Sequence, residues 1–273
     1  MAEIVNRIWK RYTFIFEDLT DPRTNTWFLV ARPYQGMAIL ALYLMFVLKW
    51  GPRWMKNRPA YNINKVLIVH NIFQVIASAW TFCAGVWYGW GWDYKWICEP
   101  VDFSSSQKAI MVAKVTYAYY LIKYMDLMDT VFFVLRKKTN QVSFLHVYHH
   151  TSMVMLSWGS ITYLPGGHAS LIGVINSFVH VVMYTYYLLS VITPSVKNSV
   201  GWKKHITQLQ IIQLLWCCIH ISILIFKSEC AYPRWVSFLI LPGDVFMLSL
   251  FVDFYFRAYI RRPKVQSNGV KKD

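Results

Sequence analysis

Long apolar stretches separated by short polar segments run through most of the chain. Seven of them approach or exceed the roughly 20 residues that a membrane-spanning helix needs. They lie at residues 34–48, 66–90, 109–135, 144–164, 168–192, 206–226 and 235–256. The last contains Pro242 and Gly243, which predicts a kink supported by neighbouring helices. The pattern therefore predicts an all-α integral membrane protein with seven transmembrane helices.

Nothing in this pattern indicates a second domain. Residues 1–273 contain no internal repeat, low-complexity segment or linker. Residues 1–26 are charged rather than apolar, so a cleavable signal sequence is not expected. We expect one membrane domain with an N-terminal segment of about residues 1–33, helices over about 34–256 and a basic tail of about 257–273.

Composition excludes several other classes of protein. The chain is 56% hydrophobic and 15% charged, whereas an average soluble domain carries about 25% charged residues. Its 18% aromatic content excludes a disordered chain. The net charge of +15 would suit a nucleic-acid-binding protein, but such a protein would not contain stretches of membrane-spanning length. Nucleic acid is therefore not an expected partner.

The distribution of charge predicts the orientation in the membrane. Most Lys and Arg residues lie in the tail and in the segments that follow the first, third and fifth stretches, with Asp273 as the one acidic residue there. The N-terminal segment and the other loops have nearly balanced charge. Because basic loops stay in the cytosol, we expect a lumenal N-terminus and a cytosolic C-terminus.

Charged residues within the apolar stretches are the first candidates for function. Lys114 and Asp253 lie near helix ends, where their side chains can reach the membrane surface. Lys123, Asp126 and Asp129 are spaced by three and share one helical face with the next residue, Thr130. An ion pair that only stabilises the bundle is the structural alternative. Asp244 also remains inside a stretch.

Three histidines share one face at the start of stretch 144–164. His146, His149 and His150 stand at positions i, i+3 and i+4. One histidine in such a helix is usually a packed residue, but three on one face indicate chemistry. That chemistry is either metal ligation or acid–base and nucleophilic catalysis.

The next two stretches each carry a polar face at helical spacing. The side chains concerned are Asn176, His180, Tyr184 and Tyr187 in the first, and Thr207, Gln210 and Gln213 in the second. Each face alone could serve to hold helices together. Four successive helices with polar faces predict a shared interior cavity.

These motifs resemble the ELO family of very-long-chain fatty acid elongases, the membrane 3-ketoacyl-CoA synthases. The resemblance rests on HxxHH at 146–150, NxxxHxxMYxYY at 176–187 and TxxQxxQ at 207–213. The family's KxxExxDT motif has Glu where this chain has Asp126, which is one methylene shorter. Gln141 lies five residues before the HxxHH motif. A glutamine at this position resembles the branch of the family that acts on already long chains.

The resemblance implies that a long acyl-CoA condenses with malonyl-CoA to a 3-ketoacyl-CoA two carbons longer, with release of CO₂ and CoA. It implies that helices two to seven surround a tunnel for the acyl chain, with helix one outside. No metal or other cofactor is expected beyond the two CoA substrates. Membrane lipid and other enzymes of the elongation cycle are expected partners, and the oligomeric state is left open.

The resemblance also implies residence in the endoplasmic reticulum membrane. The dilysine retrieval signal of such proteins is imperfect here, because only Lys271 stands at an expected position. Cys98 and Cys230 lie in loops on the expected lumenal side, where an oxidising environment permits a disulfide. The other cysteines, Cys83, Cys217 and Cys218, lie within apolar stretches and are expected to be packed thiols.

The polar faces offer imidazole rather than Cys or Ser as a nucleophile. We expect His149 to take the acyl group and His180 to orient the thioester. Asp126 and Asp129 would hold neighbouring imidazoles in the required tautomer. Hydrogen bonds to the developing oxyanion would come from Asn176, Tyr184 or Gln210. Direct attack by the malonyl-CoA enolate, with histidine as general base, is the alternative.

Further substrate contacts are expected from side chains near these groups. Lys123, Tyr187 and Gln213 belong to the same polar faces. The phosphates of CoA are expected to meet basic residues on the cytosolic side, with Lys137, Lys138, Lys203 and Lys204 as candidates. Each of these four could equally be a topological anchor.

Two other functions fit part of the pattern. A membrane di-iron desaturase or hydroxylase also uses HxxHH, but it needs several histidine motifs. The remaining histidines of this chain are isolated in the sequence, at His70, His168, His180, His205 and His220. A seven-helix transporter or receptor would explain a polar cavity but gives no reason for three clustered imidazoles.

Overall fold

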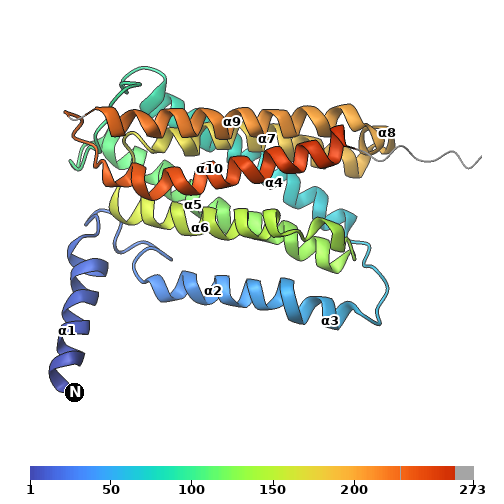
Figure 1. Cartoon of the computed structure of the whole chain (residues 1–273), viewed down its shortest axis with the longest axis horizontal. Coiled ribbons are helices and arrows are strands. Elements are labelled where there is room, and N and C mark those ends of the chain that lie inside the picture. The colour runs from blue at the N-terminus through green and yellow to red at the C-terminus, as the bar shows by residue number, and fades with distance from the viewer. Residues whose placement is uncertain (228, 262–273) are drawn as a thin grey trace, which may run out of the picture.

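The computed structural model describes residues 1–227 and 229–261. Helices make up most of this part of the chain, and it contains no strand. Seven long helices correspond to the seven predicted stretches and lie side by side (Figure 1). They are α2 (Pro33–Met45), α4 (Asn64–Gly85), α5 (Gln107–Leu135), α6 (Phe144–Tyr163), α7 (Ser170–Ile192), α9 (Val200–Phe226) and α10 (Trp235–Tyr255).

Local sequence fixes where several of these helices begin. Ser106, Ser143 and Ser199 each accept a hydrogen bond from the backbone N–H three residues on, at the starts of α5, α6 and α9. This is the interaction that favours serine at a helix N-terminus. Pro33 occupies the first turn of α2, where no backbone N–H is needed.

Six of the long helices form a closed ring. Going round it, α4 contacts α5, α5 contacts α6, α6 contacts α10, α10 contacts α9, α9 contacts α7, and α7 contacts α4. Helix α2 lies outside this ring, and its Tyr43 hydroxyl is 2.8 Å from the Thr130 hydroxyl of α5. The predicted arrangement, with the first membrane helix outside a ring of six, is confirmed.

Five helical segments of the described chain are long and apolar enough to span a membrane. They cover Pro33–Met55, Asn64–Trp90, Ser170–Ile192, Val200–Phe226 and Trp235–Ile260. Helices α5 and α6, with 29 and 20 residues, are also long enough to span a membrane, but they carry the charged and histidine side chains that the ring encloses. The protein is therefore a multi-pass membrane protein whose two most polar helices direct their polar faces into the ring.

The structure extends some of the predicted elements. The first span continues beyond residue 48 through η2 (Phe46–Trp50) and α3 (Gly51–Met55). Helix α4 continues as η3 (Val86–Trp90), and α10 passes through Pro242 and continues as η5 (Phe256–Ile260). The short helix α8 (Pro194–Asn198) joins α7 to α9. Lys271 of the expected retrieval signal lies outside the described residues.

The N-terminal segment holds a helix that the sequence pattern did not predict. Helix α1 (Ala2–Thr13) lies crosswise to the long helices at one end of the bundle (Figure 1). The turn η1 (Phe14–Asp18) follows it. Beyond the turn, Asp21 N–H donates to Thr162 O, and Thr24 donates to Ile161 O. The segment is therefore anchored to the end of α6.

Candidate active site

Helix α5 carries the buried charges. Lys123 and Asp126 are 2% and 1% exposed, and Lys123 Nζ donates to Asp126 Oδ2 at 2.8 Å. The same ammonium donates to Asn176 Oδ1 of α7 at 2.9 Å and lies over the Tyr119 ring. A buried charge is tolerated only when it is paired and hydrogen-bonded in this way. The structure therefore joins the polar faces of α5 and α7.

Tyr184 of α7 links the two carboxylates of α5. Its hydroxyl lies 2.9 Å from Asp126 Oδ1 and 2.7 Å from Asp129 Oδ2. Gln74 of α4 donates to the same Asp126 oxygen at 2.7 Å. Because Tyr184 and Gln74 are fully buried, these hydrogen bonds form in a medium where charge is poorly screened. Three helices are held together at this point.

Helix α4 supplies residues that sequence reasoning missed. His70 Nε2 lies 3.1 Å from Asp129 Oδ1, although His70 is isolated in the sequence. Its signal was the buried polar face His70, Gln74 and Ser78, which repeats every four residues inside an apolar stretch. His70 is therefore a member of the polar cluster that the sequence analysis did not name.

The three histidines of α6 are brought together as predicted by their spacing. The ring centroids of His146 and His150 are 4.3 Å apart, and those of His149 and His150 are 5.2 Å apart. The His149 ring also lies 6.0 Å from that of Phe251 in α10. His146 Nε2 is shielded and has no hydrogen-bond partner in the described chain. The cluster therefore keeps imidazole nitrogen available for a ligand.

His180 connects the histidine cluster with the carboxylates. Its Nδ1 lies 3.6 Å from Asp126 Oδ2, beyond hydrogen-bonding distance, and it has no other partner among the described residues. It is also close enough to His149 to interact with it electrostatically. The His180 ring therefore stands between Asp126 and the α6 cluster.

The imidazoles that neighbour the carboxylates of α5 come from α4 and α7 rather than from α6. Asp129 instead contacts His70, and Asp126 lies near His180. The reason is the packing of α5, whose carboxylate face contacts α4 and α7 rather than the histidine face of α6. The imidazoles that neighbour Asp126 and Asp129 are thus His180 and His70, and it stays a prediction that the carboxylates hold them in the required tautomer.

The remaining polar residues lie at different distances from this cluster. Asn176 Nδ2 lies 3.5 Å from Gln213 Oε1, which brings α9 into the network. Gln210 Nε2 instead contacts the Met183 sulfur at 3.5 Å. The Tyr187 ring centroid lies 5.7 Å from that of Tyr184. Of the predicted α9 glutamines, only Gln213 reaches the described network around Lys123.

Basic residues gather at the end of the ring nearest the histidines, which we call the basic end. Burial and the positive charges of Arg136, Lys197 and Lys203 lower the pKa of Lys138. This interaction places Lys138 and Lys203, which were both predicted, in one cluster with Arg136 and Lys197, which were not. Lys137 turns away and donates to the Lys56 carbonyl. For Lys204, no contact with this cluster is described.

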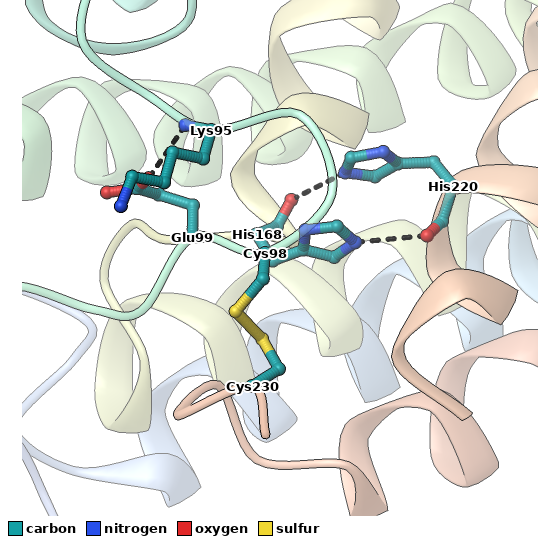
Figure 2. The surroundings of a disulfide bond; sticks show 6 residues. All are labelled: Lys95, Cys98, Glu99, His168, His220 and Cys230. Carbon is teal, nitrogen blue, oxygen red and sulfur yellow. Dashed lines mark hydrogen bonds between the residues drawn. A yellow bond between two sulfur atoms is a disulfide. The ribbon is translucent and has the colours of Figure 1, made fainter. Parts of the chain in front are cut away.

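The opposite end of the ring, here the disulfide end, is held by a covalent bond. Cys98 and Cys230 form a disulfide with Cα atoms 5.7 Å apart (Figure 2). Beside it, His168 and His220 stack with ring centroids 3.8 Å apart. Each Nε2 donates to the other residue's backbone carbonyl, at 3.0 and 3.1 Å. These two histidines are isolated in the sequence but paired in space.

An apolar cavity of about 100 Å³ lies between the polar cluster and the disulfide end. Tyr119, whose hydroxyl donates to Asn176, lines the side toward the cluster. Trp90 and Ser170 line the other side and are hydrogen-bonded to each other. Leu156, Ile172 and Val174 contribute to its apolar wall. No group of three His, Cys, Asp or Glu residues in the described chain is placed to hold a metal ion.

The ring of membrane helices encloses paired charges, clustered imidazoles and an apolar cavity, and so defines a membrane protein with a buried polar site beside an apolar cavity. The chain belongs to the ELO family, described as the GNS1/SUR4 family, whose model matches residues 28–267. Because the chain belongs to this family, the two alternative functions, a di-iron desaturase or hydroxylase and a seven-helix transporter or receptor, are not favoured.

Curated relatives match over most of their lengths. Very long chain fatty acid elongase 7 of Drosophila melanogaster is 40% identical over 257 residues, covering 94% of this chain and 78% of the relative. The protein of that name from Rattus norvegicus is 37% identical, with coverage of 98% and 96%. Very long chain fatty acid elongase 4 of Homo sapiens is 36% identical, with coverage of 93% and 83%.

Proposed function

We propose that this protein is a fatty acid elongase with 3-ketoacyl-CoA synthase activity. It joins a long-chain acyl-CoA to malonyl-CoA and yields a 3-ketoacyl-CoA two carbons longer, CO₂ and CoA. The observation that carries this proposal is the position of the imidazole cluster of α6 and His180. It lies between a basic end suited to CoA and an apolar cavity suited to an acyl chain.

Each part of the substrate has a matching region of the ring. The acyl chain enters the cavity because burial of methylene groups is favourable by about 0.8 kcal/mol each. The phosphates of CoA meet the cluster of Arg136, Lys138, Lys197 and Lys203, since multiple cations at one site attract a polyanion. The thioester then falls between these regions, beside the histidines.

Catalysis begins with attack of a neutral His149 ring nitrogen on the thioester carbonyl carbon. The carbon–sulfur bond breaks, and the departing CoA thiolate takes the proton that the other imidazole nitrogen loses. His180, polarised by Asp126 at 3.6 Å, orients the thioester. Asn176 is the candidate donor to the oxyanion that develops on the carbonyl, because its Nδ2 carries a second hydrogen beside the one directed at Gln213. The Tyr184 proton is already given to the carboxylates of Asp126 and Asp129.

Chain extension follows when malonyl-CoA loses CO₂. The electron pair of the broken carbon–carbon bond forms an enolate, which attacks the acyl carbon and displaces His149. The imidazole regains a proton from solvent, so the reaction consumes one proton overall. Direct attack of the enolate on acyl-CoA, with histidine as general base, has the same balance but no acyl-enzyme.

The charge distribution supports the topology proposed with this reaction. The basic end faces the cytosol, where both CoA substrates are supplied, and the disulfide end faces an oxidising lumen. We assign the protein to the endoplasmic reticulum membrane, with membrane lipid and the enzymes of the other elongation steps as its partners. No metal takes part in the proposed reaction.

Purified protein in lipid nanodiscs with long-chain acyl-CoA and labelled malonyl-CoA tests the proposal. We expect labelled 3-ketoacyl-CoA, insensitive to chelators, and its loss by more than 100-fold in His149→Ala. The matched control is His205→Ala, because His205 is exposed and bonded only to Gln208 in the described chain. Absence of product with every acyl-CoA would contradict the proposal.

The same preparation separates the two chemical routes. The covalent route releases CoA from acyl-CoA before malonyl-CoA is added, and it leaves an intact-mass increase equal to the acyl group. That increase disappears in His149→Ala. Release of CoA only in the presence of malonyl-CoA, with no mass increase, would establish direct attack.

A further inference from the structure

Asp244 is a carboxyl group that the proposed reaction does not use. It lies in α10 and lines the apolar cavity between the polar cluster and the disulfide end. Its Oδ2 is shielded from solvent and has no hydrogen-bond partner among the described residues. A polar group inside a membrane without a partner destabilises the protein, and such residues usually serve a function.

The cavity wall around Asp244 offers hydrogen-bond acceptors. Thr81, Thr116 and Ser157 line it, and each hydroxyl already donates to a backbone carbonyl of its own helix, at 2.9, 3.0 and 2.6 Å. Their oxygens can therefore only accept. The Tyr119 hydroxyl likewise donates to Asn176. None of these hydroxyls donates to Asp244, so a molecule in the cavity that carries a hydrogen-bond donor can supply a partner for its Oδ2.

The helix geometry gives the depth of Asp244 along that molecule. The His149 ring lies beside Phe251 of α10. Asp244 is two turns before Phe251, which is about 10 Å along the helix. The direction is away from the basic end, because Asp244 shares the cavity with Ser170 and Trp90. An acyl chain attached at His149 would therefore pass Asp244 near its middle.

We propose that Asp244 forms a subsite for a hydroxyl group in the middle of the acyl chain, so that hydroxylated long-chain acyl-CoA is a substrate class of this protein. A hydroxyl both donates and accepts, and thus pairs with a carboxyl group in either protonation state. A keto or ether group would pair only with the protonated form. This inference rests on the proposed elongase function, since it needs an acyl chain in the cavity.

Kinetics of the unaltered protein in nanodiscs test the subsite first. The substrates are unsubstituted octadecanoyl-CoA and three isomers that carry one hydroxyl next to the thioester, at mid-chain or at the methyl end. We expect kcat/KM for the mid-chain isomer to exceed that for the methyl-end isomer by about tenfold, because only the former reaches the carboxyl group. Equal values for all three isomers would overturn the subsite.

Two variants then assign the preference to Asp244. Asp244→Leu is expected to abolish the tenfold ratio between the mid-chain and methyl-end isomers. The matched control, Asp253→Leu, removes the same residue type from an exposed position of the same helix, where Asp253 pairs with Arg257, and it keeps the ratio. An unchanged ratio in Asp244→Leu overturns the assignment.

The outcomes also distinguish this inference from the elongase proposal. Elongation of unsubstituted octadecanoyl-CoA without a positional preference refutes the subsite and supports the elongase. Failure to elongate any acyl-CoA refutes both. If Asp244→Leu does not fold, Asp244→Ala replaces it, and a tenfold ratio that does not fall at all in that variant overturns the assignment.

Discussion

The hydroxyl of Tyr184 lies 2.7 Å from Asp129 Oδ2 and ties the middle of α7 to α5 inside the ring. The same hydroxyl lies 2.9 Å from Asp126 Oδ1, so one side chain serves both carboxylates of the site. Two like charges that share a hydrogen-bond donor become more repulsive when that donor is removed. Tyr184 is therefore as important for the shape of the site as any residue on the proposed reaction path.

Replacement of Tyr184 by phenylalanine tests this role. Tyr184→Phe is expected to lower the free energy of unfolding by about 2–4 kcal/mol, because buried carboxylates lose charge-assisted hydrogen bonds. Thermal unfolding in detergent measures the change. Tyr187→Phe is the control, since the Tyr187 ring lies beside that of Tyr184 but no hydrogen bond of its hydroxyl is described. Equal losses in the two variants would contradict the prediction.

The Lys123–Asp126 ion pair gives a second prediction. Asp126→Asn should destabilise the protein by about 3–5 kcal/mol, because it leaves the Lys123 ammonium buried without its counter-charge. The double variant Lys123→Met, Asp126→Asn should recover part of this loss. Unfolding of the single and double variants under one condition gives the coupling between the two residues. Strictly additive losses would show that the pair is not coupled.

The disulfide gives a prediction about stability rather than chemistry. Cys98→Ser is expected to cost about 2–5 kcal/mol, because the bond closes a loop between residues 132 apart in the sequence. Cys83→Ser is the control, because Cys83 is free and exposed, contrary to the expectation of a packed thiol. Peptide maps with and without reductant would reveal the bond directly. Free alkylation of both Cys98 and Cys230 in unreduced protein would show that the bond does not form.

The lowered pKa of Lys138 leads to a prediction of how CoA binding depends on pH. Its pKa lies below the ordinary 10.5 because of burial and neighbouring cations. Bound phosphate favours the charged form, so binding raises this pKa and takes up a proton. Affinity for CoA should therefore fall as pH rises through the pKa of free Lys138. Calorimetry across this range measures the fall, and Lys138→Arg, which stays charged, should make it shallower. An identical pH profile in Lys138→Arg would exclude Lys138 from the site.

The sequence predicted the helices well because the membrane imposes a simple condition on length and polarity. The histidine face of α6 was equally predictable, since residues at i, i+3 and i+4 must share a side of one helix. The partner of Asp129 was not predictable in this way. It is His70, 59 residues away, and nothing in a single sequence states which helices of a ring are neighbours.

Two other features of the structure were not predicted from the sequence, for different physical reasons. Helix α1 was not predicted because it is charged and too short to span a membrane. Its apolar residues, Ile4, Ile8 and their neighbours, do recur at helical spacing. The pairing of His168 with His220 depends on backbone carbonyls, which carry no sequence signal. Both features depend on how segments meet rather than on which residues they contain.

Within the described residues, the disulfide gives the ring a covalent link at one of its two ends. A covalent link restricts thermal motion most at its own end of a helix bundle, so we expect the amplitude of motion to be largest at the opposite end. That opposite end is the basic end, where Lys138 and Lys203 lie. The proposed entrance for CoA is therefore the end of the ring that the disulfide does not restrain.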